Sequence, residues 1–161
     1  MNEFLSKLSS YNLFNYLFPG VIFAFLADEV TKYSFIQSNI VIGLFLYYFI
    51  GLVISRFGSL ILEPFLRWSK FIHFQDYGKF VEAEKKDAKL EILCEASNMY
   101  RTLCSLFFLL LALKLYELIE RALPFLKGWA VIILVILLFV AFLFSFKKQT
   151  GYITKRIKAN E

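Results

Sequence analysis

The stretch Trp129–Phe146, WAVIILVILLFVAFLFSF, contains eighteen residues and no charged side chain. An α-helix needs roughly 20 predominantly apolar residues to cross the hydrocarbon core of a bilayer, which is about 30 Å thick. A helix on the surface of a soluble domain would instead need polar residues along its water-facing side. This stretch therefore predicts a membrane-spanning helix and places the chain among integral membrane proteins.

Earlier parts of the chain repeat this pattern, with apolar runs at Leu13–Ala27, Ile36–Ile54 and Leu103–Leu118. The overall composition agrees, because 59% of the residues are hydrophobic, whereas soluble domains have about half. The first run would reach only about 22 Å as a helix, so whether it fully spans is open. It also contains Pro19 and Gly20, and the missing N–H of Pro19 predicts a kink there. We expect an all-α polytopic membrane helical bundle with about four transmembrane helices.

The only polar region of any size lies between the second and third runs. We expect one long amphipathic helix from about Gly78 that leads directly into the third span. Its apolar side, with Phe80, Leu90 and Leu93, is a candidate docking face for a cytosolic protein partner. The predicted organisation is an interfacial N-terminal helix and first transmembrane hairpin in residues 1–66, a cytoplasmic loop and amphipathic helix in 67–98, a second transmembrane hairpin in 99–146 and a basic cytoplasmic tail in 147–161.

The distribution of lysine and arginine predicts the orientation in the membrane. With the N-terminus inside, thirteen Lys and Arg residues lie on the cytoplasmic side, and only Lys32, Arg121 and Lys127 lie outside. Cytoplasmic loops of membrane proteins have such an excess of positive charge. We therefore expect a multi-pass protein of the bacterial inner membrane with both termini in the cytoplasm. The net charge of +5 is explained by topology, so direct binding of nucleic acid is not expected.

Small residues recur every four positions in the second span, at Gly51, Ser55 and Ser59. This spacing places them on one face of a helix, where small side chains let two helices approach closely in lipid. The pattern predicts a helix-packing site or a contact between copies of the chain in a homo-oligomer. Glu63 continues the same row, which favours a position at a helix contact.

Ionisable residues within or near the apolar runs are candidates for function, because charges in hydrocarbon are costly. Arg56 and Glu63 lie about two helical turns apart, and Lys114 and Glu117 lie three residues apart near the end of the third span. Two interpretations of Arg56 are open: it lies inside the membrane and lines a polar path, or it extends to the membrane surface. For Lys114 and Glu117, a local pair at the membrane surface is favoured over a transport or sensing role.

The sequence contains no recognisable catalytic or cofactor motif. His73 is the single histidine and has no second histidine or cysteine nearby to complete a metal site. Cys94 and Cys104 would lie about 15 Å apart on one helix, beyond disulfide reach. We therefore expect no cofactor, no metal and no enzymatic activity.

The layout as a whole resembles a known class of proteins. It combines the Phe18-Pro19-Gly20 helix, a second helix with small residues, and a charged helix leading into Asn98-Met99-Tyr100-Arg101. This layout is similar to small four-pass membrane proteins of bacterial anti-phage defence loci, the KwaA-like membrane subunits of the Kiwa system. The resemblance implies an oligomeric inner-membrane sensor that works with a cytosolic DNA-binding partner, and no functional residue is transferred from it.

The resulting hypothesis is a non-enzymatic inner-membrane sensor or scaffold subunit that oligomerises and couples a membrane event to a cytosolic partner in anti-phage defence. The alternative is a homo-oligomeric ion channel or pore-forming effector whose path passes Arg56, Glu63 and Lys114. A third possibility, a lipid-modifying enzyme, lacks a recognisable pairing of base and nucleophile.

Overall fold

The computed structural model describes residues 12–87 and 89–159, and its regular elements are all helical. The predicted all-α fold is confirmed, and four helical segments are long and apolar enough to cross a membrane, in agreement with a multi-pass membrane protein. The interfacial helix predicted near the N-terminus, before Tyr11, lies outside the described residues. The elements are the π-helical turn η1 (Leu13–Leu17), α3 (Phe18–Val30), α4 (Ile40–Phe57), the π-helical turn η2 (Gly58–Leu62), α5 (Glu63–Trp68), α6 (Tyr77–Lys86), α7 (Lys89–Ala122) and α8 (Leu126–Lys158).

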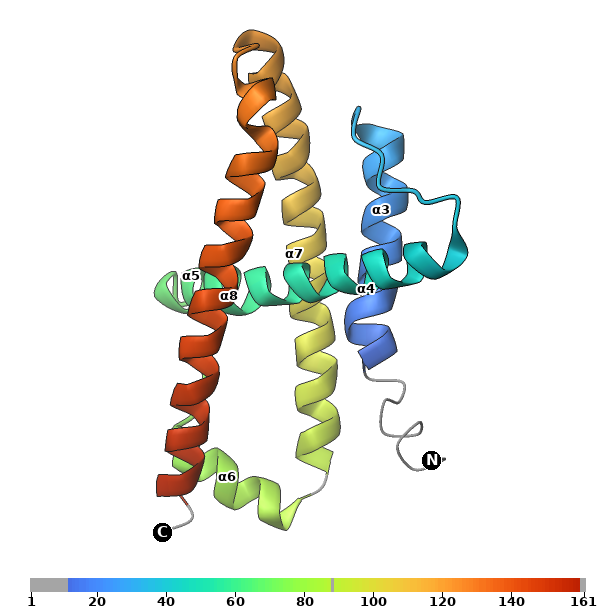
Figure 1. Ribbon diagram of the computed structural model, residues 1–161. Helices are drawn as coiled ribbons and strands as arrows, with labels where there is room; N and C mark the ends of the chain where they lie inside the picture. The colour runs from blue at the N-terminus through green and yellow to red at the C-terminus, as the bar shows by residue number, and fades with distance from the viewer. Residues whose placement is uncertain (1–11, 88, 160–161) are drawn as a thin grey trace.

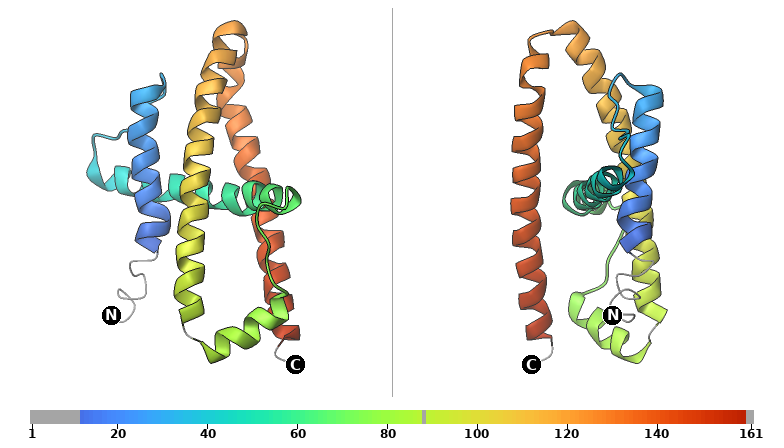
Figure 2. Two further views of the ribbon diagram at one scale, coloured as in Figure 1. Left: turned by 180° about the vertical axis from the view of Figure 1, so that it is seen from behind. Right: turned by 45° about the vertical axis from the view of Figure 1, so that its right-hand side comes forward.

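Three of the long helices run lengthwise, and α4 crosses them steeply (Figure 1). Helices α3 and α7 run in the same direction and α8 runs back, while α4 lies between α8 on one side and the α3–α7 pair on the other (Figure 2). Helix α6 lies beside the start of α7 and the end of α8, and we call this the α6 end. The opposite end, where a short turn joins α7 to α8, is called the turn end.

Two glycines explain why α4 crosses α3 instead of running back alongside it as a hairpin would. A Cβ atom added to Gly20 would lie 1.8 Å from the carbonyl oxygen of Tyr47, and one added to Gly51 would lie 1.7 Å from that of Tyr16. The η1–α3 segment and α4 therefore each present a tyrosine carbonyl and, four residues later, a glycine to the other. With no side chain between them, the two backbones are in direct contact.

The apolar core lies around this crossing, on the side away from α8. Its buried members come from α3, α4 and α7, and they are Phe23, Ala27, Ile54, Leu106 and Leu110. No residue of α8 is buried. The apolar surface of α8 is therefore left for lipid or for another chain, as expected of a membrane protein that exposes more apolar area than a soluble monomer.

The predicted single helix from about Gly78 into the third span is wrong at one point. The chain forms two helices there, because α6 ends at Lys86 and Asp87 is extended, with φ −136° and ψ 100°. The Asp87 side chain accepts a 2.9 Å hydrogen bond from the backbone N–H of Lys89, as aspartate does when it precedes a helix. The helix that leads into the third apolar run is therefore α7, and it begins at Lys89.

Helix α6 is partly covered by α8, although its apolar side was expected to be a docking face for a partner. Val81 is fully buried, and the Tyr77 ring lies 6.1 Å from the ring of Tyr152 on α8. Arg156 of α8 forms a 3.0 Å ion pair with Glu84 of α6. These contacts hold α6 against α8, so the apolar side of α6 is not wholly free for a partner.

Candidate functional site

Glu63 binds two basic residues from two other helices, and with Ser59 these form what we call the Glu63 cluster. Arg101 of α7 places Nη1 2.6 Å from Glu63 Oε2, and Lys148 of α8 places Nζ 3.6 Å from Glu63 Oε1. Lys148 also donates hydrogen bonds to the Ser59 carbonyl oxygen at 2.6 Å and to its hydroxyl at 2.7 Å. Glu63 is buried, so this carboxylate joins α5, α7 and α8 through charge.

The local helix geometry places Glu63 at this position. The π-helical turn η2 comes directly before Glu63-Pro64, and the Glu63 N–H donates to the carbonyl oxygen of Gly58, five residues back. A wider turn accommodates the ring of the following proline, which cannot donate a backbone hydrogen bond. A Cβ on Gly58 would lie 2.4 Å from the hydroxyl oxygen of Ser105, so this glycine lets α7 approach and bring Arg101 to Glu63.

The other π-helical turn, η1, also places a polar side chain against α7, at Thr102, the residue after Arg101. Turn η1 comes directly before Phe18-Pro19, and its Asn15 is buried. The hydroxyl of Thr102 lies 3.1 Å from Asn15 Oδ1 and 2.8 Å from the carbonyl oxygen of Asn98. Asn15 within η1 and Glu63 directly after η2 thus contact adjacent residues of α7, Thr102 and Arg101. Such turns frequently mark functional sites.

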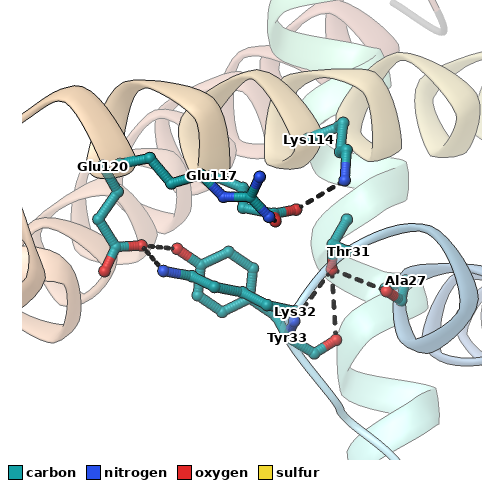
Figure 3. Close-up of polar contacts among 8 residues, drawn as sticks. Ala27, Thr31, Lys32, Tyr33, Lys114, Glu117 and Glu120 are labelled. Carbon is teal, nitrogen blue, oxygen red and sulfur yellow. Dashed lines mark hydrogen bonds and ion pairs between the residues drawn. The ribbon is translucent and has the colours of Figure 1, made fainter.

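A second group of charges, the Glu117–Glu120 cluster, lies near the end of α7 and so toward the turn end. Figure 3 shows its contacts. Lys114 Nζ lies 2.9 Å from Glu117 Oε2, and Arg121 contacts the other oxygen of the same carboxylate. Lys32 Nζ lies 2.6 Å from Glu120 Oε2, which also accepts a hydrogen bond from the Tyr33 hydroxyl. Both glutamates are buried, and the second one ties the segment after α3 to α7.

The segment after α3 is itself ordered by Thr31. Its hydroxyl donates a 2.7 Å hydrogen bond to the Ala27 carbonyl oxygen at the end of α3, and it accepts one from the Tyr33 N–H at 3.1 Å. These bonds set the direction in which the chain leaves α3 (Figure 3). Lys32 and Tyr33 are thereby directed at Glu120.

Partial burial and the hydrogen bond to Glu120 raise the pKa of the Tyr33 phenol above its ordinary value. We expect Tyr33→Phe to lower the melting temperature by about 3 °C, because one hydrogen bond to a charged group is lost. The folded state keeps the phenol proton to a higher pH than the unfolded state, so the stability from this group is lost as the pH rises above about 10. Thermal unfolding in detergent from pH 8 to 11 should show a steeper decline for the native protein than for the variant, and equal declines would contradict this assignment.

The structure places the remaining predicted residues as follows. The guanidinium of Arg56 lies 3.4 Å from the hydroxyl of Tyr16 and does not pair with Glu63. Gly51 and Ser55 are buried within the chain, whereas Ser59 accepts a hydrogen bond from Lys148. The role of these small residues between copies of the chain stays a prediction.

The predicted docking residues differ in exposure. Phe80 and Leu90 are partly buried, and the ring of Phe80 lies 6.4 Å from that of Tyr77. Leu93 is 62% exposed, and its neighbour Ile92 is 65% exposed. Between these two helices, the more accessible apolar surface is therefore at the start of α7 and not on α6.

The described residues contain no group of three or more His, Cys, Asp or Glu side chains that could hold a metal ion. The two charge clusters contain carboxylates already paired with lysine or arginine, an arrangement that fixes helices relative to one another.

No protein-family model, curated protein or solved structure matches this chain.

Sequence reasoning did not single out Arg101, Lys148, Tyr33 or Glu120. Arg101 and Lys148 were counted as topology-determining charges, and their pairing depends on contacts between residues 38 and 89 positions apart. One signal was present in the sequence: both π-helical turns are followed by a residue and then proline, as Phe18-Pro19 and Glu63-Pro64. The polar residue beside Pro64 would have indicated Glu63, whereas Asn15 lies four residues before Pro19 and Phe18 stands next to that proline.

Proposed function

We propose that this chain is a non-enzymatic inner-membrane subunit that couples an event at one face of the membrane to a soluble partner at the other. The observation that supports this is that α7 is one continuous helix of 34 residues with a polar cluster on each half. Arg101 belongs to the Glu63 cluster, and Glu117 and Glu120 belong to the other. From Arg101 to Glu117 the helix rises about 24 Å.

The two clusters connect α7 to different parts of the chain. At the turn end, Glu120 holds the segment after α3 through Lys32 and Tyr33. Nearer the start of α7, Arg101 pairs with Glu63, which also pairs with Lys148 of α8. A displacement of the turn-end segment would therefore shift α7 as a rigid element and change the position of α8, to which α6 is attached. Packed helices with a few discrete arrangements are the usual means of such coupling.

The charge distribution supports a cytoplasmic α6 end, with the turn end outside. The tail residues Lys155, Arg156 and Lys158 and the lysines of α6 lie at the α6 end, and positive residues concentrate on the cytoplasmic side of membrane proteins. We place the chain in a homo-oligomer, with the uncovered apolar surface of α8 facing lipid or another copy. The resemblance in layout to anti-phage defence subunits supports a role in that process.

The partner-binding surface in this proposal is the start of α7. Ile92 and Leu93 are both more than 60% exposed in a stretch that is otherwise rich in charge, including Lys89, Glu91 and Glu95. Two adjacent apolar side chains surrounded by charged residues are typical of a protein-binding surface, where burial of such groups supplies affinity.

The test is to purify the tagged chain from its native membrane and to quantify the soluble proteins recovered with it. We expect a soluble companion in a fixed ratio to the chain, reduced at least about tenfold by Ile92→Glu with Leu93→Glu, since two buried apolar contacts are lost. Lys89→Gln with Glu91→Gln is the matched control in the same turn and should retain the companion.

The pore alternative gives a different outcome in the same experiment. If the chain is recovered without any companion in a fixed ratio, and liposomes containing it leak a small dye, the coupling role is rejected. Leakage that is lost on Arg56→Ala would then assign a conducting path.

A further inference from the structure

A cavity of about 610 Å³ opens between the η2–α5 segment and α8, next to the Glu63 cluster. Four basic side chains line it, Arg67 from α5 and Lys147, Lys148 and Lys155 from α8, against the single carboxylate of Glu63. Glu63 is already bound by Arg101 and Lys148. The walls of the cavity therefore have a clear excess of positive charge.

Two of these lysines are available to a ligand. In the part of the chain that the structure describes, no carboxylate lies within ion-pair distance of Lys147 or Lys155. They lie two turns apart on α8, on either side of Gly151, where the absence of a side chain leaves the cavity open. Ammonium groups in this arrangement can surround one phosphate.

The position of the cavity relative to the apolar helices indicates the kind of phosphate. Lys147 follows directly on the uncharged stretch Trp129–Phe146, so the cavity lies where α8 leaves the hydrocarbon. Leu60 and Phe144 contribute apolar walls beside the basic residues. Charge at the level of the headgroups next to an apolar wall matches a molecule with an anionic phosphate and acyl chains.

We propose that this cavity binds the phosphate of an anionic phospholipid. The shared chemistry is a phosphate ester, which a soluble phosphate could also supply, and the apolar walls favour the lipid. The site is independent of the proposed coupling function, because it requires only the cavity and its basic residues.

The first test removes charge without changing the Glu63 cluster. Native mass spectrometry of the detergent-solubilised protein is used to measure the dissociation constants of phosphatidylglycerol, phosphatidylcholine and glycerol-1-phosphate. We expect saturable 1:1 binding of phosphatidylglycerol that weakens about a hundredfold in Arg67→Gln/Lys147→Gln/Lys155→Gln, from about fivefold for each basic residue. The control Lys79→Gln/Lys86→Gln/Lys158→Gln removes the same charge at the same end of the molecule and should weaken binding by less than about threefold.

The second test fills the cavity and keeps every charge. Gly151→Leu places a side chain in the cavity on a helix position where an added Cβ meets no atom within 4 Å, so the variant should fold. Gly128→Leu is the matched control on the same helix, also in open space. We expect phosphatidylglycerol binding to fall at least about tenfold in Gly151→Leu only, since an occupied cavity excludes the headgroup.

Each outcome decides the proposal. Specific binding of phosphatidylglycerol supports the lipid, whereas equal affinity for glycerol-1-phosphate supports the same site with a soluble phosphate as its ligand. The proposed site is overturned if phosphatidylglycerol binding is unchanged in both the triple charge variant and Gly151→Leu. It is also overturned if binding falls equally in the matched control variants. Binding of phosphatidylcholine as tight as that of phosphatidylglycerol also overturns it, because the basic residues then contribute no selectivity.

Discussion

Gly51→Ala is expected to separate α4 from the η1–α3 segment and to give one of the largest losses of stability available in this chain. The added methyl group would lie 1.7 Å from the carbonyl oxygen of Tyr16, which is backbone and cannot rotate away. The helices must move apart, so the contacts around Gly20, Ile54 and Phe23 loosen together. We expect a loss of more than about 3 kcal/mol in the free energy of unfolding, at the upper end for an overfilled core.

The matched controls for this change are on α8. Gly128→Ala and Gly151→Ala add the same methyl group where nothing lies within 4 Å. Because alanine favours a helix over glycine, these variants should gain up to about 1 kcal/mol. Unfolding in detergent with increasing SDS measures all three. If Gly51→Ala unfolds at the same SDS fraction as the α8 controls, the α3–α4 crossing is not made through these glycines.

Glu63→Gln should produce the second large effect, because it leaves Arg101 and Lys148 close together without their counter-ion. The side chains of Glu63, Arg101 and Lys148 are 10%, 24% and 26% exposed, so water screens this repulsion only in part. Removing one partner from a buried ion pair costs about 3–5 kcal/mol, and partial exposure reduces the expected loss to about 2–3 kcal/mol. Melting in detergent should show a decrease of roughly 5–10 °C.

A second substitution separates loss of charge from loss of packing. Glu63→Gln with Lys148→Met removes one charge of each sign, and it should recover a measurable part of the lost stability relative to Glu63→Gln alone. Glu84→Gln breaks the surface pair with Arg156 and should cost less than about 1 kcal/mol. No recovery in the double variant would mean that Glu63 contributes through shape and hydrogen bonding and not as a counter-ion.

The fold was largely predictable from the sequence because hydrocarbon imposes a simple rule on composition. An uncharged apolar run such as Trp129–Phe146 is stable as a helix in the hydrocarbon core of a membrane, so the four apolar segments could be found in the sequence by inspection. The residues at which the helices begin and end were harder to predict. Helix α4 begins at Ile40 because Asn39 accepts hydrogen bonds from the N–H groups of Val41 and Ile42, whereas the apolar run begins at Ile36.

The candidate site was predictable only in part. Glu63, Lys114 and Glu117 were singled out because a charge beside apolar residues needs a partner, and Lys114 with Glu117 lies within one helix turn. The partners of Glu63 could not be predicted, because periodicity along the segment from α4 to α5 indicates which residues share a face but not which helix covers that face. That choice depends on the steep crossing of α4, which is set by contacts at Gly20, Gly51 and Gly58.

The position of α4 between two layers also determines the order in which the protein can be assembled. Synthesis proceeds from the N-terminus, so α3 and α4 can make their glycine contact before the ribosome has produced α7 or α8. Helix α7 then brings Arg101 to Glu63, and α8 follows with Lys148 and lies on the other side of α4. Until α8 is inserted, α4 stays open to lipid on one side and the cavity beside Glu63 has only one wall. The cavity beside Glu63 therefore gains its second wall only when α8 has been inserted.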